Sequence, residues 1–280
     1  MPDQDTDIPI GSHEAYNFPR RELFLKFPFN LLFGIKRSFA ADCWYTLRSN
    51  PPLPEFIGLE NVPADGSFVV VGNHYERPGV EMYFAGMAVA AAVAQARPAS
   101  PEMHWIITSE WRGRHFGPFP IPVWPIRWVF SRIARVYGFV TMPQGEEETA
   151  GRAAALRQAA TIIKPPADNS RGQRRDGEPV GLMPEARGKG TLIEAMPGSG
   201  LFLRMLTKAG APVLPVGLYE EGGGLVVKFG EPFQLQVKHR AGREEEDRLV
   251  REQAMVAVGR LLPERMWGFY ADAIAKSLER

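Results

Sequence analysis

Apolar, β-branched runs alternate along the chain with amphipathic stretches. Ser67 to Gly72 reads Ser-Phe-Val-Val-Val-Gly, which predicts a buried strand. Similar patterns predict strands at His104 to Thr108, Val136 to Met142, Val180 to Met183, Pro212 to Tyr219 and Leu225 to Phe229. Helices are predicted at Val80 to Ala96, Glu146 to Lys164, Gly200 to Lys208 and Arg243 to Leu262. Alternating strands and helices are typical of an α/β protein, here with a central mixed β-sheet flanked by helices.

The N-terminal part differs from this pattern. Residues 1–20 are predicted to form a flexible tail, and residues 21–50 an amphipathic helical segment that touches the membrane. Phenylalanines and leucines crowd this segment with lysines and arginines between them, which suits a helix or helix pair at a lipid interface. The alternative is a core helix, because Pro28 and Gly34 interrupt the amphipathic pattern. Residues 51–280 then form the α/β domain.

No segment is long enough to span a bilayer. The longest uncharged run, Met82 to Ala96, has 15 residues, and a spanning helix needs about 20. The first residues are acidic, unlike a secretory signal. Phe116 to Val129, rich in aromatic residues and proline, is interpreted as a surface loop, a lid or a second membrane-touching patch. We therefore expect a cytoplasmic protein associated peripherally with the inner face of the cell membrane.

Composition excludes several classes of function. The 280 residues include 33 Lys plus Arg and 32 Asp plus Glu, and this balance argues against a nucleic-acid-binding protein. A single cysteine, Cys43, excludes internal disulfides and multi-cysteine metal sites. We expect no metal or redox cofactor.

Two predicted strands end in residues that can do chemistry. His74 follows the strand that ends at Gly72, and an imidazole there can act as a general base, although a lone histidine is more often structural. The strand at Val180 to Met183 runs into Pro184-Glu185-Ala186-Arg187-Gly188-Lys189. Arg187, Lys189 and backbone N–H groups of this turn can hold an anionic or hydroxyl-bearing substrate. Gly188 indicates a close approach of the backbone to another group.

These motifs in series resemble the glycerolipid acyltransferase superfamily, which includes lysophosphatidate and glycerol-3-phosphate acyltransferases. The order is a strand with Asn73-His74, then roughly 110 residues later a strand with Pro-Glu-x-Arg, then Lys-Ala-Gly-x-Pro-Val-x-Pro-Val from Lys208. Lys228 to Phe233 and Leu262-Pro263-Glu264 are similar to later family segments, so the resemblance covers roughly residues 55–270.

The resemblance implies a fold, a reaction and roles for these residues. His74 would take the proton from an acceptor hydroxyl, which attacks the thioester of acyl-CoA or an acyl-carrier protein. Glu185 and Arg187 would help to bind the acceptor head group, and the strand at Val213 to Val216 would border the acyl pocket. The partners implied are a membrane lipid surface and the acyl carrier.

The sequence departs from the family pattern after the histidine. Where the family has an aspartate that orients the imidazole, this chain has Gly79. Glu81, expected on the first turn of the next helix, is the preferred substitute, and Glu76 is the alternative. A carboxylate within hydrogen-bond distance of His74 would favour an enzyme. No carboxylate within reach, together with an intact apolar groove, would favour a lipid-binding module.

A second departure concerns the acceptor. The family's middle motif usually has an arginine for the substrate phosphate, and the matching stretch, Gly138 to Gly145, has none; Arg77, Arg152 or Lys189 are candidate replacements. The third motif reads Glu-Ala-Arg-Gly instead of Glu-Gly-Thr-Arg. The resemblance implies an O-acyltransferase for a lysophospholipid hydroxyl. The alternatives are a non-phosphate lipid alcohol or glycolipid as acceptor, a thioester hydrolase, or a non-catalytic lipid-binding protein.

Overall fold

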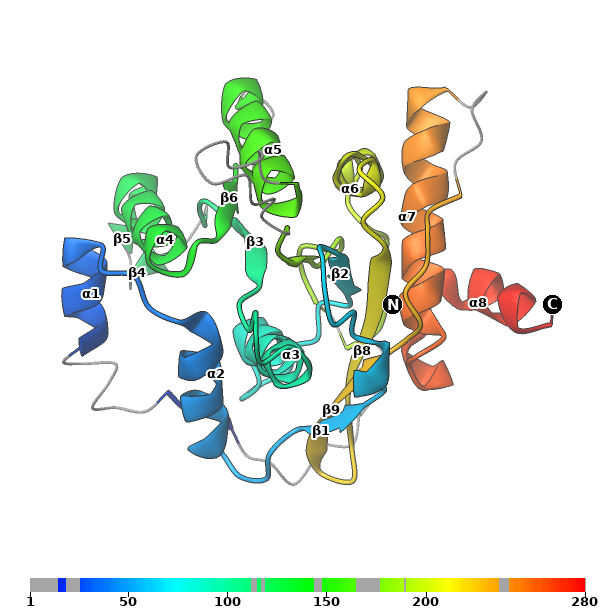
Figure 1. Cartoon of the computed structure of the whole chain (residues 1–280), viewed down its shortest axis with the longest axis horizontal. Helices are drawn as coiled ribbons and strands as arrows, with labels where there is room; N and C mark the ends of the chain where they lie inside the picture. The colour runs from blue at the N-terminus through cyan, green and yellow to red at the C-terminus, as the bar shows by residue number, and fades with distance from the viewer. Residues whose placement is uncertain are drawn as a thin grey trace.

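The computed structural model describes residues 15–18, 26–111, 115–116, 119–143, 148–164, 177–188, 190–236 and 242–279. Its centre is a seven-stranded sheet (Figure 1). In spatial order the strands are β1 (Glu55–Ile57), β9 (Gly224–Phe229), β8 (Val213–Glu221), β2 (Val69–Gly72), β7 (Val180–Leu182), β3 (His104–Thr108) and β6 (Val140–Met142). A separate small hairpin pairs β4 (His115–Phe116) with β5 (Phe119–Pro120).

Most neighbouring strands run parallel. β2 lies between β7 and β8 and is parallel to both, with Val71 opposite Leu182 and Gly72 opposite Val216. β9 is antiparallel to β8, and β1 is parallel to β9. The predicted α/β class with a mixed central sheet is therefore confirmed. The carboxyl ends of β2 and β7 lie at one edge, where ligand sites of such sheets usually form.

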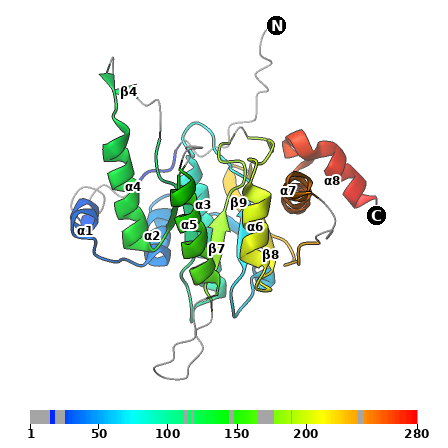
Figure 2. The same ribbon diagram turned by 90° about the horizontal axis from the view of Figure 1, so that it is seen from above.

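Helices cover both faces of the sheet. Figure 1 shows α2 (Phe39–Arg48) and α3 (Met82–Ala96) on one face, and α5 (Thr149–Ile163), α6 (Ser199–Thr207) and α7 (Arg243–Gly259) on the other. Figure 2 shows α1 (Phe27–Phe33) and α4 (Val123–Tyr137) at one end of the molecule and α8 (Ala271–Leu278) at the opposite end. Short 3₁₀ turns are η2 (Leu59–Asn61), η3 (Glu264–Met266) and η4 (Gly268–Tyr270).

The core lies where the sequence is most apolar. All four residues of β2 are buried, and α3 is buried along most of its length between α2 and the sheet. Small alanines dominate α3, so its backbone can approach its neighbours closely from every side. The rigid strand β2 and the buried helix α3 fix both ends of the segment that carries His74.

Two expectations about secondary structure were wrong. Val136 to Met142 is not one strand: helix α4 continues to Tyr137, Gly138 ends it with φ +75°, and only Val140–Met142 form β6. Part of the proline-rich stretch Phe116 to Val129 is the start of α4, so the loop interpretation is wrong there, whereas the membrane-touching alternative stays a prediction. Pro125 is tolerated there because the N–H groups of a first helical turn have no partner within the helix.

The predicted N-terminal helical segment consists of two helices with different surroundings. In α2, Phe39, Cys43 and Leu47 are buried in the core, which agrees with the core-helix alternative. In α1 no residue is buried, and α1 packs on α4 at the edge of the molecule. None of the helices in the described ranges is long and apolar enough to cross a bilayer.

The two edge helices expose large apolar side chains. We call this set the α1–α4 platform; its members are Phe29, Leu32, Phe33, Ile35, Trp124, Trp128 and Val129. Trp124 is 73% exposed and Phe33 is 61% exposed. Arginines lie beside it: the Arg132 guanidinium stacks on Trp128 at 5.3 Å, and Arg135 lies against Gly34. The platform therefore combines an apolar surface with neighbouring cations.

Candidate active site

The ends of β2 and β7 are joined by the carboxylate of Glu185. The backbone N–H of His74 donates to Glu185 Oε2 at 2.7 Å, and the backbone N–H of Ile193 donates to Oε1 at 2.7 Å. The Glu185 side chain is buried, and burial raises its pKa to about 7 despite these two bonds. Glu185 thus holds the backbone of His74 in place, a role that the sequence did not reveal.

The His74 imidazole is mostly buried, with 9% of the side chain exposed. Its Nδ1 atom is buried and accepts no hydrogen bond from the described residues. Glu76 Oε2 lies 3.8 Å from Nδ1, which is within ion-pair range but longer than a hydrogen bond. Among the described residues, the hydrogen-bonded carboxylate that would favour an enzyme over a lipid-binding module is therefore not present. Burial lowers the pKa of His74, and the charge of Glu76 acts in the opposite direction. The imidazole is therefore neutral near pH 7 and can accept a proton.

Gly188 packs directly on His74. A Cβ atom at this glycine would lie 2.1 Å from the His74 carbonyl oxygen and 2.9 Å from Nδ1. Any side chain here would push the imidazole or its loop aside. The close approach expected at Gly188 is therefore an approach to the candidate base itself.

The turn that follows Glu185 contains backbone strain. Ala186 adopts φ +58°, a left-handed conformation that costs a non-glycine residue roughly 1–2 kcal/mol. In the family that the sequence resembles, this place in the motif holds glycine. Such strain persists where the surroundings fix the backbone, and it is common at functional sites.

Two further contacts fix the segment around His74 to β8. The buried Asn73 side chain donates from Nδ2 to the Leu218 carbonyl at 2.8 Å and accepts the Leu218 N–H at 2.7 Å. Glu220, at the end of β8, accepts from Arg77 Nε at 2.5 Å and from the Tyr75 hydroxyl at 2.7 Å. Neither role was predicted. Glu220 lies at the carboxyl end of β8, which reaches this same edge, and a position at the carboxyl end of a strand is the signal that had singled out His74.

The turn after Arg77 explains why residue 79 is glycine, where the family that the sequence resembles has aspartate. Arg77 and Val80 exchange two backbone hydrogen bonds, at 3.0 and 2.9 Å, around Pro78-Gly79. Gly79 has φ +86° there, so an aspartate at this position would be strained. Glu76, two residues after the histidine, lies before this turn and beside the imidazole.

The remaining predicted site residues are Glu81, Arg77, Arg187 and Lys189, and they have different surroundings. Glu81 is the exposed N-cap residue of α3, and among the described residues the ion-pair contact of His74 is with Glu76. Arg77 is held by Glu220. Arg187 is exposed and has no hydrogen-bond or ion-pair partner among the residues that the structure describes. Lys189 and the arginines at 171–175 lie outside the described residues.

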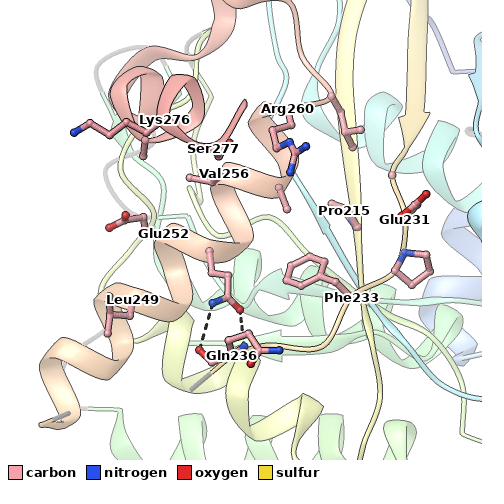
Figure 3. Close-up of a pocket in the computed structure, with 16 residues that line it drawn as sticks. Pro215, Glu231, Phe233, Gln236, Leu249, Glu252, Val256, Arg260, Lys276 and Ser277 are labelled. Carbon is pink, nitrogen blue, oxygen red and sulfur yellow. Dashed lines mark hydrogen bonds between the residues drawn. The ribbon is translucent and has the colours of Figure 1, made fainter. Parts of the chain in front are cut away.

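A groove of about 1100 Å³ lies beside β8, in a different place from His74 and Glu185 (Figure 3). It runs between the chain after β9 and helices α7 and α8, with apolar Pro215, Phe233 and Val256 and charged Glu252 and Arg260 in its lining. His74 and Glu185 do not line it. Pro215 belongs to the strand that the resemblance places beside an acyl chain, and that placement stays a prediction.

Metal chemistry has no grouped ligands in the described part of the chain. Across those ranges, no three His, Cys, Asp or Glu side chains are close enough to hold an ion. The other histidine whose side chain the structure describes, His104, lies at the amino end of β3 and bonds to Glu178 and to the Gly138 carbonyl, at the opposite edge from His74.

No protein-family model matches the sequence, and no curated protein matches it. Among solved structures, the chain is similar to the crystal structure of the 1-acyl-sn-glycerophosphate (LPA) acyltransferase PlsC from Thermotoga maritima. The two are 19% identical, 86% of each chain is covered, and the TM-score is 0.42. At this distance a likeness does not identify the function, which has to be inferred from the residues of the site.

Proposed function

We propose that the protein is an O-acyltransferase that moves a fatty acyl group from acyl-CoA or an acyl-carrier protein to a lipid hydroxyl. The observation that carries the proposal is the joining of His74 to Glu185. Two motifs that are 111 residues apart, and that follow the order of the acyltransferase motifs, meet through a 2.7 Å hydrogen bond. This meeting supports one site built from both motifs rather than two unrelated surface turns.

His74 acts as the general base in this reaction. Its neutral imidazole removes the proton from the acceptor hydroxyl as the oxygen attacks the thioester carbonyl. The tetrahedral intermediate then collapses, the carbon–sulfur bond breaks, and the proton passes to the departing thiolate. The backbone N–H of Gly188, packed beside His74, is the candidate donor for the oxyanion.

Glu76, rather than Glu81, is the carboxylate that orients His74. Glu76 Oε2 lies 3.8 Å from Nδ1, and its side chain is 36% exposed, so a small rotation can close the contact. Hydrogen bonds in unliganded active sites often shorten only when substrate binds. A closed contact would stabilise the imidazolium that forms during proton transfer.

The acceptor is a lysophospholipid-like molecule whose head group meets Arg187. This arginine is exposed on the turn that follows Glu185 and bonds to no other described residue, so its guanidinium is available for a phosphate. The buried ion pair of Arg77 with Glu220 favours the second candidate, an acceptor alcohol without phosphate, because it removes one of the candidate cations.

The α1–α4 platform is proposed to bind the membrane that supplies the acceptor. Its partner would be an anionic bilayer, because exposed tryptophans and phenylalanines lie beside Arg132 and Arg135. An exposed apolar surface of this kind usually marks an interaction site. The protein would then be peripheral, on the cytoplasmic face of the cell membrane.

The central test measures thiol release from palmitoyl-CoA with anionic vesicles, with and without lysophosphatidate. We expect acceptor-dependent release, and a roughly 10²- to 10⁴-fold loss of the rate in His74→Ala, since that is the usual contribution of a general base. Glu76→Gln is expected to lower the rate about tenfold, and Glu81→Gln serves as its matched control with a rate near wild type.

Other outcomes point elsewhere. Release without acceptor that His74→Ala abolishes would indicate a thioester hydrolase. Transfer to a glycolipid or a sterol-like alcohol, but not to lysophosphatidate, would establish the acceptor without phosphate. Vesicle binding without release from any acyl-CoA or acyl-carrier protein, with any acceptor, would overturn the enzyme proposal in favour of a lipid-binding module.

A further inference from the structure

Residues 15–18, which we call the N-terminal strap, are packed although the sequence predicts a flexible tail. Tyr16 is only 4% exposed. Asn17 is held at both backbone groups by the buried Asn50 side chain: its N–H donates to Asn50 Oδ1 at 2.7 Å, and its carbonyl accepts from Nδ2 at 2.9 Å. This two-sided pairing fixes the strap to the end of α2.

The strap contacts the turn that follows the candidate base. The Tyr16 N–H donates to the Gly79 carbonyl at 2.8 Å, so the strap bonds to the Arg77–Val80 turn. The Tyr16 ring packs against Phe84, and the Phe18 ring against Tyr83 and Phe84, at the start of α3. The strap therefore lies across the turn and the first residues of the helix behind it.

The turn is held on its other side by β8. Arg77 forms two hydrogen bonds with Glu220, at 2.5 and 2.6 Å, and Tyr75 adds a third. Burial, followed by the charge of Glu220, raises the pKa of Tyr16 to about 12, so Tyr16 is neutral and lies within the field of that carboxylate. The segment from Tyr75 to Val80 is thus enclosed between Glu220 and the strap.

We infer that the N-terminal strap, through Tyr16, is a positioning element for His74 and Glu76. The inference rests on the proposed acyltransferase function. Between β2 and α3 the segment has no helix or regular strand of its own, so its shape depends on such external contacts. Without the strap the Arg77–Val80 turn opens more often, and Glu76 is aligned with Nδ1 for a smaller fraction of the time.

The test compares Tyr16→Ala with Tyr16→Phe in the full chain. The matched control is Tyr45→Ala, at a tyrosine that is 50% exposed on the neighbouring helix α2. We expect Tyr16→Ala to lower kcat about ten- to a hundredfold with little change in KM for the thioester, as small misplacements of catalytic groups do. Tyr16→Phe keeps the ring and the backbone bond and should retain the wild-type rate.

A second readout is independent of activity. Hydrogen exchange at the Arg77 and Val80 amides reports whether the turn is closed, because these amides bond across it. Exchange should become about tenfold faster in Tyr16→Ala, and stay unchanged in Tyr45→Ala, under conditions in which circular dichroism shows every variant folded. Unchanged exchange in Tyr16→Ala would overturn the positioning role. Faster exchange in a protein that transfers no acyl group would uphold the strap and reject the proposed function alone.

Discussion

The His74 edge and the α1–α4 platform are built in opposite ways. At the His74 edge, side chains bond to distant parts of the chain. Glu185 accepts from the backbone of His74, Asn73 donates to Leu218 of β8, and Glu220 forms an ion pair with Arg77. At the platform, large apolar side chains are exposed, and α1 has no buried residue. A site for chemistry needs fixed groups, whereas a surface for a fluid bilayer needs only exposed apolar area. The contrast supports the proposal that the His74 edge carries the reaction and that the platform binds the membrane.

Removing the apolar side chains of the platform should give the largest effect of the following changes. We expect Phe33→Ser with Trp124→Ser to weaken binding to anionic vesicles by at least about a hundredfold, because the two changes together lose roughly 3–6 kcal/mol of apolar transfer. The thermal midpoint should stay near wild type, since both side chains are mostly exposed. Vesicle co-sedimentation measures the binding.

The matched control for this change is Phe269→Ser, at a phenylalanine that is 62% exposed away from the platform. Equal losses for both sites would show that the platform is not the docking surface. Substitutions are preferable to deletion of residues 1–40, which would also remove the strap and the buried Phe39 and Ala40.

Weakening the link between the two strand ends is the next test. In Glu185→Gln an NH₂ group faces one of the two backbone N–H donors, so a buried donor loses its partner. We expect the free energy of unfolding in urea to fall by about 1–3 kcal/mol, and acyl transfer to fall with it. Glu264→Gln, on an exposed glutamate, should change neither. A fully active and stable Glu185→Gln protein would contradict the proposed link.

The pH dependence of stability gives a sharper test of Glu185. Its pKa is about 7 in the folded protein and 4.5 is its ordinary value, so between these values the folded state binds more protons than the unfolded state. Wild type should therefore lose stability relative to Glu185→Gln as pH rises from 4.5 to about 7, and no further above that. Urea unfolding across this range measures the difference, and a constant difference would refute it.

The pH profile of catalysis tests the pairing of His74 with Glu76. Because burial lowers the pKa of His74, the acid limb of kcat/KM should lie below pH 6.5, with activity lost as the imidazole is protonated. The charge of Glu76 opposes this shift, so Glu76→Gln should move the acid limb to still lower pH. If Glu81→Gln moved the acid limb and Glu76→Gln did not, Glu81 would be the carboxylate that orients His74, as the sequence analysis preferred.

The smallest effect is expected at the opposite edge of the sheet, at His104 and Glu178. Burial lowers the pKa of His104, but its bonds with Glu178 and Gly138 outweigh this and raise it, while the bond with His104 lowers the pKa of Glu178. The pair should stabilise the fold fully between pH 4.5 and 6.5, and its contribution should disappear as pH leaves this window on either side through the shifted values.

This contribution should not exceed about 1 kcal/mol, because Glu178 is 47% exposed and solvent screens the pair. Urea unfolding of Glu178→Gln across the window measures it. Acyl transfer should be unaffected by this change, since the pair lies away from the His74 edge. A large loss of activity would mean that the two edges are coupled more strongly than their separation suggests.

The sequence predicted which strand ends carry the residues of the candidate site, but not all the contacts between them. Strand ends marked His74 and the turn of Glu185, because a buried parallel strand has an apolar signature and its carboxyl end is where polar groups gather. The same reasoning did not find Glu220, whose partner Arg77 is 143 residues away. Helix α4 was missed because its aromatic and proline-rich start was interpreted as a loop, a lid or a surface patch, and its last two residues as the beginning of a strand.

By itself, the sequence determined the α/β class, the order of the motifs and the residue available as a base, because these follow from local periodicity and residue chemistry. Tertiary structure decided what each motif residue does. It placed Glu76 beside the imidazole, whereas Glu81 lies beyond the Pro78-Gly79 turn as the N-cap residue of α3. It made Glu185 a link between strands, and it turned residues 15–18 into a strap. Contacts between residues far apart in the chain depend on the packing of the whole sheet, and no local pattern encodes them.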